Sequence, residues 1–175
     1  MKYNEKLFIA YTAGFFDSSV SLRVTIQKKD TLRYKHELKI CLYFPFKTRK
    51  HYPFFDKLKK QFGGTIIVAK GSKGSSSYII QSTNTINEFL KLLLPFLMAR
   101  KDLCLKILDI IEAKIKVTNV NDFIQLVELV DQFSLYSPFS KYRVPKYSVS
   151  LVKQRLSMQP VETLKTIRKK RTVLR

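Results

Sequence analysis

The feature that most constrains the fold of this chain is a change of hydrophobic period near residue 18. Residues 7–17 read as a helix with small residues clustered late. Directly after it, every second residue from Val20 to Ile26 is apolar, and the residues between them are polar. That period of two marks a strand with one buried and one exposed face. We therefore predict a helix that leads into a strand at residues 20–28.

Strand pairs separated by helices are predicted along the rest of the chain. In order, they are a strand from His36, a helix over 49–62 that stops at Gly63 and Gly64, strands at 65–69 and 77–82, and helices near 84–94, 101–116 and 120–134. The loop between the second pair of strands is rich in Gly and Ser. Antiparallel strand pairs separated by helices predict an α+β domain.

The charge of the chain indicates the kind of partner. Thirty-three Lys and Arg against 13 Asp and Glu give a net charge of +20, and 45% of the residues are hydrophobic. This is the composition of a basic globular protein, so we expect a polyanionic partner. The two Cys and two His offer no zinc-site spacing, and we predict no metal and no cofactor. The longest strongly apolar stretch, residues 89–97, is too short to cross a bilayer, so no membrane partner is expected.

The C-terminal region is a separate basic segment by composition. Residues 140–175 hold eleven Lys and Arg against the single acid Glu162, which is 11 − 1 = +10 of the net charge. We predict a nucleic-acid-binding domain over residues 1–138 and a basic extension over 139–175. Residues 163–173 are predicted to form a helix only against a partner.

The junction between the first helix and the first strand resembles the signature of the LAGLIDADG homing endonucleases. The residues that carry it are Thr12, Ala13, Gly14, Phe15, Phe16, Asp17, Ser18 and Ser19. Further similarity to the single-motif, chloroplast-type members lies in residues 55–58, 95–97 and 105–112, and it covers about residues 3–135. The resemblance implies an αββαββα core with an antiparallel, saddle-shaped sheet, to which this chain adds C-terminal helices and a basic tail.

In that family the motif helices of two copies pack together, and small residues let their backbones approach. Ala13 and Gly14 preserve this feature, so the resemblance implies a possible homodimer through the motif helix. The alternative is that an Ala-Gly pair at a helix end is ordinary packing within one chain.

The chain departs from the family where the chemistry is expected. The metal-binding carboxylate of the family stands at the eighth motif position, which is Ser19 here, while Asp17 matches an acid whose family role is mainly structural. A neutral hydroxyl is a poor ligand for Mg²⁺. Phe46 or Lys47 occupies a position where the family often has a polar residue. At another position the family has a basic residue, and here Arg100 or Lys101 retains that charge. We therefore predict that endonuclease activity is lost and that the chain is not an enzyme.

Basic residues on predicted strands, loops and the C-terminal extension are the candidate nucleic-acid contacts. They are Arg23, Gln27, Lys28, Lys35, Lys39, Lys47, Arg49, Lys50, Lys70, Lys73, Arg100, Lys101, Lys141, Arg143, Lys146, Arg168, Lys169, Lys170 and Arg171. In the family such a hairpin lies in the major groove of DNA, so the resemblance implies this use for those of the first hairpin, although polar alternation alone also gives a merely solvated strand face. The second hairpin has few long polar side chains, so base reading there is expected to be weak.

These features together predict an inactive relative of homing endonucleases that binds structured RNA. We expect it in an organellar ribosome or another ribonucleoprotein, with ribosomal or intron RNA and other subunits as partners. The alternatives are an active site-specific DNA homing endonuclease that depends on Mg²⁺, and an intron maturase. Richness in Lys, Phe, Ile and Tyr points to an AT-rich gene, hence to an organelle, with a mitochondrion preferred to a chloroplast.

Overall fold

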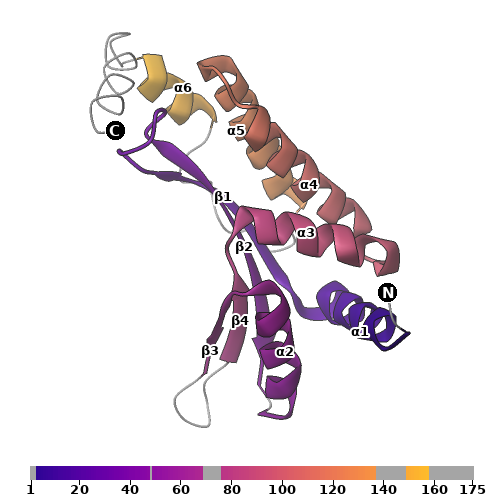
Figure 1. The fold of residues 1–175 in the computed structure, drawn as a ribbon. Coiled ribbons are helices and arrows are strands. Elements are labelled where there is room, and N and C mark those ends of the chain that lie inside the picture. The colour runs from indigo at the N-terminus through magenta and orange to yellow at the C-terminus, as the bar shows by residue number, and fades with distance from the viewer. Residues whose placement is uncertain (1–2, 48, 69–75, 137–148, 158–175) are drawn as a thin grey trace, which may run out of the picture. The chain divides into compact units, whose positions relative to one another are not determined.

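The computed structural model describes residues 3–47, 49–68, 76–136 and 149–157. Its elements are α1 (Tyr3–Ser19), β1 (Ser21–Lys28), β2 (His36–Phe46), η1 (Arg49–His51), α2 (Tyr52–Phe62), β3 (Thr65–Ile67), β4 (Ser76–Ile80), α3 (Thr83–Leu93), η2 (Leu94–Phe96), α4 (Lys101–Lys116), α5 (Val120–Tyr136) and α6 (Val149–Ser157) (Figure 1). The four strands form one sheet in the order β1-β2-β4-β3, and β4 is antiparallel to both of its neighbours. The predicted α+β class is confirmed.

The structure refines several predicted boundaries. The predicted strand 77–82 ends at Ile80, because the Ser82 side chain accepts a hydrogen bond from the Thr85 backbone N–H and so begins α3. Helix α6 lies inside the predicted basic extension, whereas the helix predicted at residues 163–173 falls outside the described residues. No helix among the described residues is long and apolar enough to span a membrane.

The chain groups into two compact units that are discontinuous in sequence. Unit 1 comprises Met1–Val24 and Lys39–Ile111, and unit 2 comprises Thr25–Leu38 and Glu112–Arg175. Strands β1 and β2 and helix α4 therefore contribute residues to both units. The domain boundary that we placed at residue 138 stays a prediction.

An aromatic cluster fills the core of unit 1. Phe44 of β2 is fully buried, and its ring centroid lies 6.3 Å from that of Phe16 in α1, 6.1 Å from that of Phe55 in α2 and 5.8 Å from that of Phe89 in α3. Tilted and edge-on pairs at these distances are favourable for aromatic rings. Helices α1, α2 and α3 therefore all reach the same face of the sheet.

The turn between α2 and β3 depends on two glycines. Gly63 closes α2 by donating its backbone N–H to the Lys59 carbonyl at 2.8 Å, and its own carbonyl accepts a hydrogen bond from the Tyr78 hydroxyl at 2.7 Å. Gly64 has a φ of 87°, and a Cβ there would stand 2.5 Å from the Ile79 carbonyl oxygen. Only glycine fits this approach without strain, so the predicted helix stop is confirmed.

In unit 2, the tip of the first hairpin is packed against the start of α5. The Tyr34 ring stacks on Phe123 with centroids 4.9 Å apart, and Arg33 donates to the Thr118 carbonyl at 2.9 Å. Asn119 and Asp122 cap α5 reciprocally, since each side chain accepts a hydrogen bond from the other residue's backbone N–H. These hydrogen bonds hold the Asp122 carboxylate in its charged form, so its pKa is lowered, with the Thr118 backbone N–H as the largest cause.

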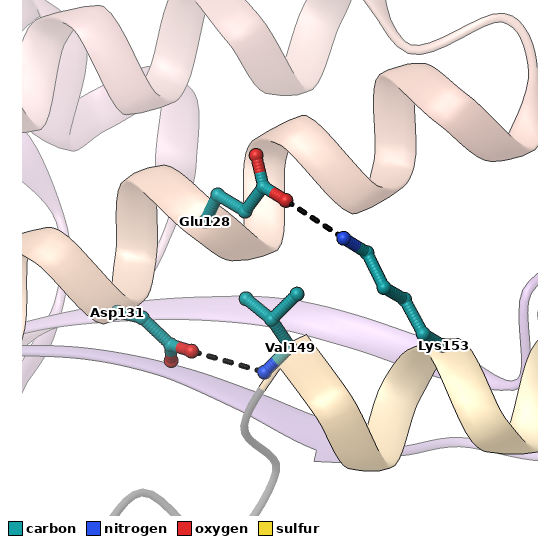
Figure 2. Close-up of polar contacts among 4 residues, drawn as sticks. All are labelled: Glu128, Asp131, Val149 and Lys153. Atoms are coloured by element: carbon teal, nitrogen blue, oxygen red, sulfur yellow. Dashed lines mark hydrogen bonds and ion pairs between the residues drawn. The ribbon is translucent and has the colours of Figure 1, made fainter.

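Helix α6 is fastened to α5 by two acids (Figure 2). The Asp131 carboxylate accepts a hydrogen bond from the Val149 backbone N–H at 3.0 Å, at the N-terminus of α6. Lys153 pairs with Glu128 at 3.1 Å, and both of these side chains are substantially exposed. Val152, fully buried, supplies the apolar part of the contact. A carboxylate at a helix N-terminus satisfies an otherwise unpaired N–H group and is favoured by the helix dipole.

We predict that Asp131→Ala loosens α6. Its backbone N–H groups should exchange with solvent deuterium faster by about fivefold, which corresponds to a loss of about 1 kcal/mol of local stability. Glu128→Ala is the matched control, because an exposed ion pair contributes little and should change exchange by less than about twofold. Equal effects of the two substitutions would contradict this assignment.

Candidate nucleic-acid interface

The carboxylate of Asp17 joins the end of α1 to the start of α4 within unit 1. Its Oδ2 accepts hydrogen bonds from the backbone N–H groups of Met98 at 2.8 Å and Ala99 at 3.2 Å, and its Oδ1 accepts one from Arg100 at 3.0 Å. These N–H groups precede α4 and have no partner inside that helix, so an acid here is stabilising. The structural role that the resemblance implied for Asp17 agrees with this geometry.

Arg100 and Cys104 lie beside this carboxylate. The Arg100 guanidinium donates from Nη1 to the Val20 carbonyl at the start of the first strand. Burial, and then the nearby Asp17 carboxylate, raises the pKa of the Cys104 thiol to about 12. Arg100 thus joins the end of α1, the start of α4 and the residue before β1. Its guanidinium is already engaged by this contact.

The family resemblance implies a divalent metal at the end of the motif, and the residues present do not fit one. Three of the roughly four lone-pair positions of the Asp17 carboxylate already accept hydrogen bonds. Ser19 is exposed and offers a hydroxyl whose Oγ lies 3.0 Å from that of Ser18. Within the part of the chain that the structure describes, no group of three or more His, Cys, Asp or Glu could hold a metal ion. A carboxylate ligand set for Mg²⁺ is therefore not assembled by the described residues of one chain.

The structure distinguishes the residues at the other two positions that the resemblance singled out. Phe46 is 6% exposed, and its ring stacks on Phe55 with centroids 4.5 Å apart, so this residue belongs to the core and does not line a polar site. Lys47, directly after it, is exposed, as is Lys101 at the start of α4. Of the alternatives left open by the sequence, Lys47 and Lys101 are the ones available to a ligand.

Ala13 and Gly14 differ in their surroundings on α1. Ala13 is fully buried in unit 1, whereas Gly14 is exposed and a Cβ added there would meet nothing within 4 Å. Leu7 and Tyr11, at 52% and 55% exposure, precede Gly14 at helical spacing. The exposed stripe of Leu7, Tyr11 and Gly14 is therefore an apolar surface of α1, and Ala13 is not part of it.

The face of the sheet opposite the aromatic core carries the polar residues of unit 1. Arg23 of β1 and Lys39 of β2 are exposed, and the Arg23 guanidinium lies over the Tyr43 ring, 5.0 Å from its centroid. The Cys41 thiol lies within hydrogen-bonding reach of Tyr43 and Gln81, and burial raises its pKa despite these contacts and the nearby cations. We call Arg23, Lys39, Cys41, Tyr43 and Gln81 the polar sheet cluster.

Arg23 and Lys39 of this cluster were among the predicted contacts, and the other three members were not. Gln81 was expected inside a strand, and Tyr43 was not singled out as a contact. Tyr43 lies two residues after Cys41, and this spacing places both on the polar face of β2. The cation–π contact of Tyr43 with Arg23 joins two strands, so the sequence of one strand does not predict it.

The predicted contacts of unit 2 are partly engaged with neighbouring residues. Lys28 pairs with Asp30 at 3.2 Å, and Gln27 is exposed. Lys35 is half-buried with a φ of 52° and lies in the hairpin turn before β2, where its backbone carbonyl accepts a hydrogen bond from the Lys29 N–H at 2.8 Å. Gln27 and Lys28 are therefore both exposed, whereas Lys35 is partly covered.

The remaining predicted contacts lie in or beside segments outside the described residues. Lys50 is exposed and Arg49 begins η1. The residues outside the described ranges are Lys70, Lys73, Lys141, Arg143, Lys146, Arg168, Lys169, Lys170 and Arg171. For these nine residues, binding stays a prediction.

Comparison with known proteins gives one sequence relative and a set of solved structures. No family model matches the chain. Over 157 residues the chain is 29% identical to the DNA endonuclease I-CreI of Chlamydomonas reinhardtii, a match that covers 89% of this chain and 94% of that protein.

Two solved structures show the same fold. The homing endonuclease I-CvuI in complex with its target has a TM-score of 0.73 at 19% identity, covering 91% of this chain and 100% of the other. The archaeal intron-encoded homing endonuclease I-Vdi141I complexed with DNA has a TM-score of 0.71 at 19% identity, covering 87% and 96%. The fold predicted from the motif is thus confirmed.

We predict that Asp17→Ala lowers the free energy of unfolding by about 1–3 kcal/mol, because three backbone N–H groups lose a charged acceptor. Asp17→Asn, which keeps one carbonyl oxygen, should lose less. Urea denaturation followed by circular dichroism measures both. Asp109→Ala, at an exposed position of α4, is the control and should stay within about 0.5 kcal/mol of the unsubstituted protein. A loss for Asp17→Ala as small as the control's would contradict the structural role.

Proposed function

We propose that this chain is a site-specific DNA endonuclease of the LAGLIDADG homing-endonuclease family. The observation that carries this proposal is the similarity to a DNA endonuclease along 89% of this chain and 94% of that protein. The match therefore extends over most of both chains and is not confined to one short motif.

The prediction that endonuclease activity is lost is wrong. It rested on Ser19 and on a second departure at Phe46 or Lys47, and it is contradicted by the 29% identity to a DNA endonuclease together with structural similarity to homing endonucleases. The physical reason is that Mg²⁺ on a nucleic-acid substrate takes many of its ligands from phosphates and water, so the loss of one carboxylate weakens a site without by itself abolishing it. One motif position in one chain does not determine such a site.

The proposed DNA contacts lie on the strand face opposite the aromatic core. A net charge of +20 favours any polyanion by release of its counterions. A two-stranded antiparallel ribbon fits the major groove of duplex DNA, where base edges are distinguishable. Long side chains such as Arg23 and Lys39 of unit 1 suit this use, and both are exposed.

Structured RNA, an organellar ribosome and a mitochondrial location stay predictions. One observation favours RNA as a second ligand class. Ile67 and Val68 at the end of β3 are 51% and 56% exposed, so the second hairpin presents apolar side chains where base reading in a duplex would use polar ones. A competition experiment with structured RNA and duplex DNA measures which of the two the purified protein binds more tightly.

Cleavage is tested on a pool of duplex DNA that includes candidate insertion sites. We predict a defined double-strand cut in Mg²⁺, read by sequencing the new ends. Ser19→Asp should raise the rate by about tenfold or more, because it supplies the charged oxygen that Mg²⁺ prefers. Ser18→Asp is the matched control, because it adds the same charge at the neighbouring exposed residue.

Two results would contradict the endonuclease proposal. One is the absence of a defined cut by either the unsubstituted protein or Ser19→Asp, with Mg²⁺ or Mn²⁺. The other is a preference for structured RNA over duplex DNA in salt-matched competition. Equal rates for Ser18→Asp and Ser19→Asp would contradict the importance of the eighth motif position.

Site-specific cutting of both strands by a chain of this size is proposed to use two copies paired through α1. The exposed stripe of Leu7, Tyr11 and Gly14 offers the apolar surface, and Gly14 allows close approach of a second backbone. Gly14→Leu should keep the fold, since nothing lies within 4 Å of the added Cβ, but it should shift a dimer to monomers in analytical ultracentrifugation. Lys91→Leu, at an exposed position of α3, is the control. Unchanged pairing in Gly14→Leu would exclude this surface.

A further inference from the structure

The tip of the first hairpin, residues 28–37, is fastened to the start of α5 within unit 2. The rings of Tyr34 and Phe123 are stacked with centroids 4.9 Å apart and planes inclined by 20°, and these residues are 8% and 4% exposed. Arg33 donates to the Thr118 carbonyl at 2.9 Å, and its guanidinium lies 5.3 Å from the centroid of the Tyr34 ring. A stacked pair with so little exposure combines apolar burial with a favourable aromatic contact.

Hydrogen bonds inside the tip order its turn but do not fix the turn to any other element. The Lys29 N–H donates to the Lys35 carbonyl at 2.8 Å, and the Lys35 N–H donates to the Leu32 carbonyl at 2.9 Å. The pairing of β2 with β4 runs from Leu42 to Phe46, so among the described strands the part of β2 nearer the tip pairs with β1 alone. A two-stranded hairpin is at best marginally stable in water. The contact with α5 therefore supplies support that no third strand gives.

The tip is also positively charged. Its residues include four Lys or Arg and two acids, a net charge of 4 − 2 = +2. The acids are taken up by two of the lysines, since Lys28 pairs with Asp30 at 3.2 Å and Lys29 with Glu37 at 2.9 Å. Among the described residues, no ion pair involves Arg33 or Lys35. The excess charge of the tip suits contact with phosphates, which position a duplex without reading its sequence.

We propose that Phe123 of α5 is a positioning residue for DNA binding, because its stack on Tyr34 holds the charged tip of the first hairpin ready for the phosphates of a duplex. This inference rests on the proposed function, since it needs a duplex along that hairpin. Phe123 itself is buried and contacts no ligand. It acts by raising the fraction of molecules in which the tip is already placed, and apparent affinity falls in proportion to that fraction.

The first measurement is backbone hydrogen–deuterium exchange of the full chain without DNA. Phe123→Leu keeps an apolar side chain and removes the stacked ring. It should speed exchange of the Lys29, Leu32 and Lys35 N–H groups by about two- to tenfold, because the tip opens more often.

The second measurement is binding to a pool of randomised DNA duplexes in Ca²⁺ over a series of salt concentrations. Phe123→Leu should weaken binding by about two- to tenfold at every salt concentration. The slope of log affinity against log salt should stay unchanged, because the complex, once formed, has the same phosphate contacts. A lost phosphate contact would lower that slope, so the slope separates positioning from direct contact.

Two further variants serve as controls. Phe133→Leu removes another buried ring of α5, 3% exposed, that forms no printed-range ring contact with the hairpin among the described residues. It should lower overall stability like Phe123→Leu and leave exchange at the tip unchanged. Tyr34→Phe keeps the stack and removes a buried hydroxyl that has no hydrogen-bond partner among the described residues, so it should retain slow exchange and full affinity.

The outcomes distinguish this inference from the proposed function. Tip exchange and duplex affinity that are the same in Phe123→Leu and Phe133→Leu overturn the positioning role while DNA binding stands. A loss in Tyr34→Phe as large as that in Phe123→Leu overturns the stack as its cause. Failure of the unsubstituted protein to bind any duplex overturns both the inference and the proposed function. Faster tip exchange and weaker binding in Phe123→Leu alone, at an unchanged salt slope, support the assignment.

Discussion

Three consecutive backbone N–H groups donate to one carboxylate, and the arrangement of unit 1 depends on that contact. The Asp17 oxygens lie 2.8 to 3.2 Å from the N–H groups of Met98, Ala99 and Arg100. Charge-assisted hydrogen bonds of this kind are stronger than neutral ones. Because β1 begins two residues after α1 ends, the same contact fixes where the polar strand face starts relative to α4 within this unit.

The alternation of side chains along the strands gives the sheet of unit 1 two distinct faces. One is filled by Phe44 and the aromatic residues of three helices, and the other carries Arg23 and Lys39 in exposed positions. The apolar face supplies the burial that stabilises the unit. The polar face is thereby left for a partner, and its positive charge and antiparallel strands suit a nucleic-acid duplex.

The correction concerning enzyme activity shows the limit of reasoning from one substituted residue. Ser19 removes a carboxylate from a position where the family resemblance places one, and that inference about the residue is sound chemistry. A metal ion on a nucleic acid, however, also takes ligands from phosphate oxygens and water, which a protein sequence does not contain. Similarity over 89% of the chain therefore carries more weight than the identity of one side chain.

The sequence by itself determined the elements and the two faces of the first hairpin, because period, glycine stops and capping residues act locally. The strand from Val20, the stop at Gly63 and the basic alternation around Arg23 were all predictable in this way. Only the tertiary structure decided that Phe46 is core, that Arg100 is engaged by the carbonyl just before β1, and that Ala13 is buried while Gly14 is exposed. It alone also placed Tyr43 under Arg23. These facts depend on which residues meet across elements, and the hydrophobic pattern of a single element carries no information about its neighbours.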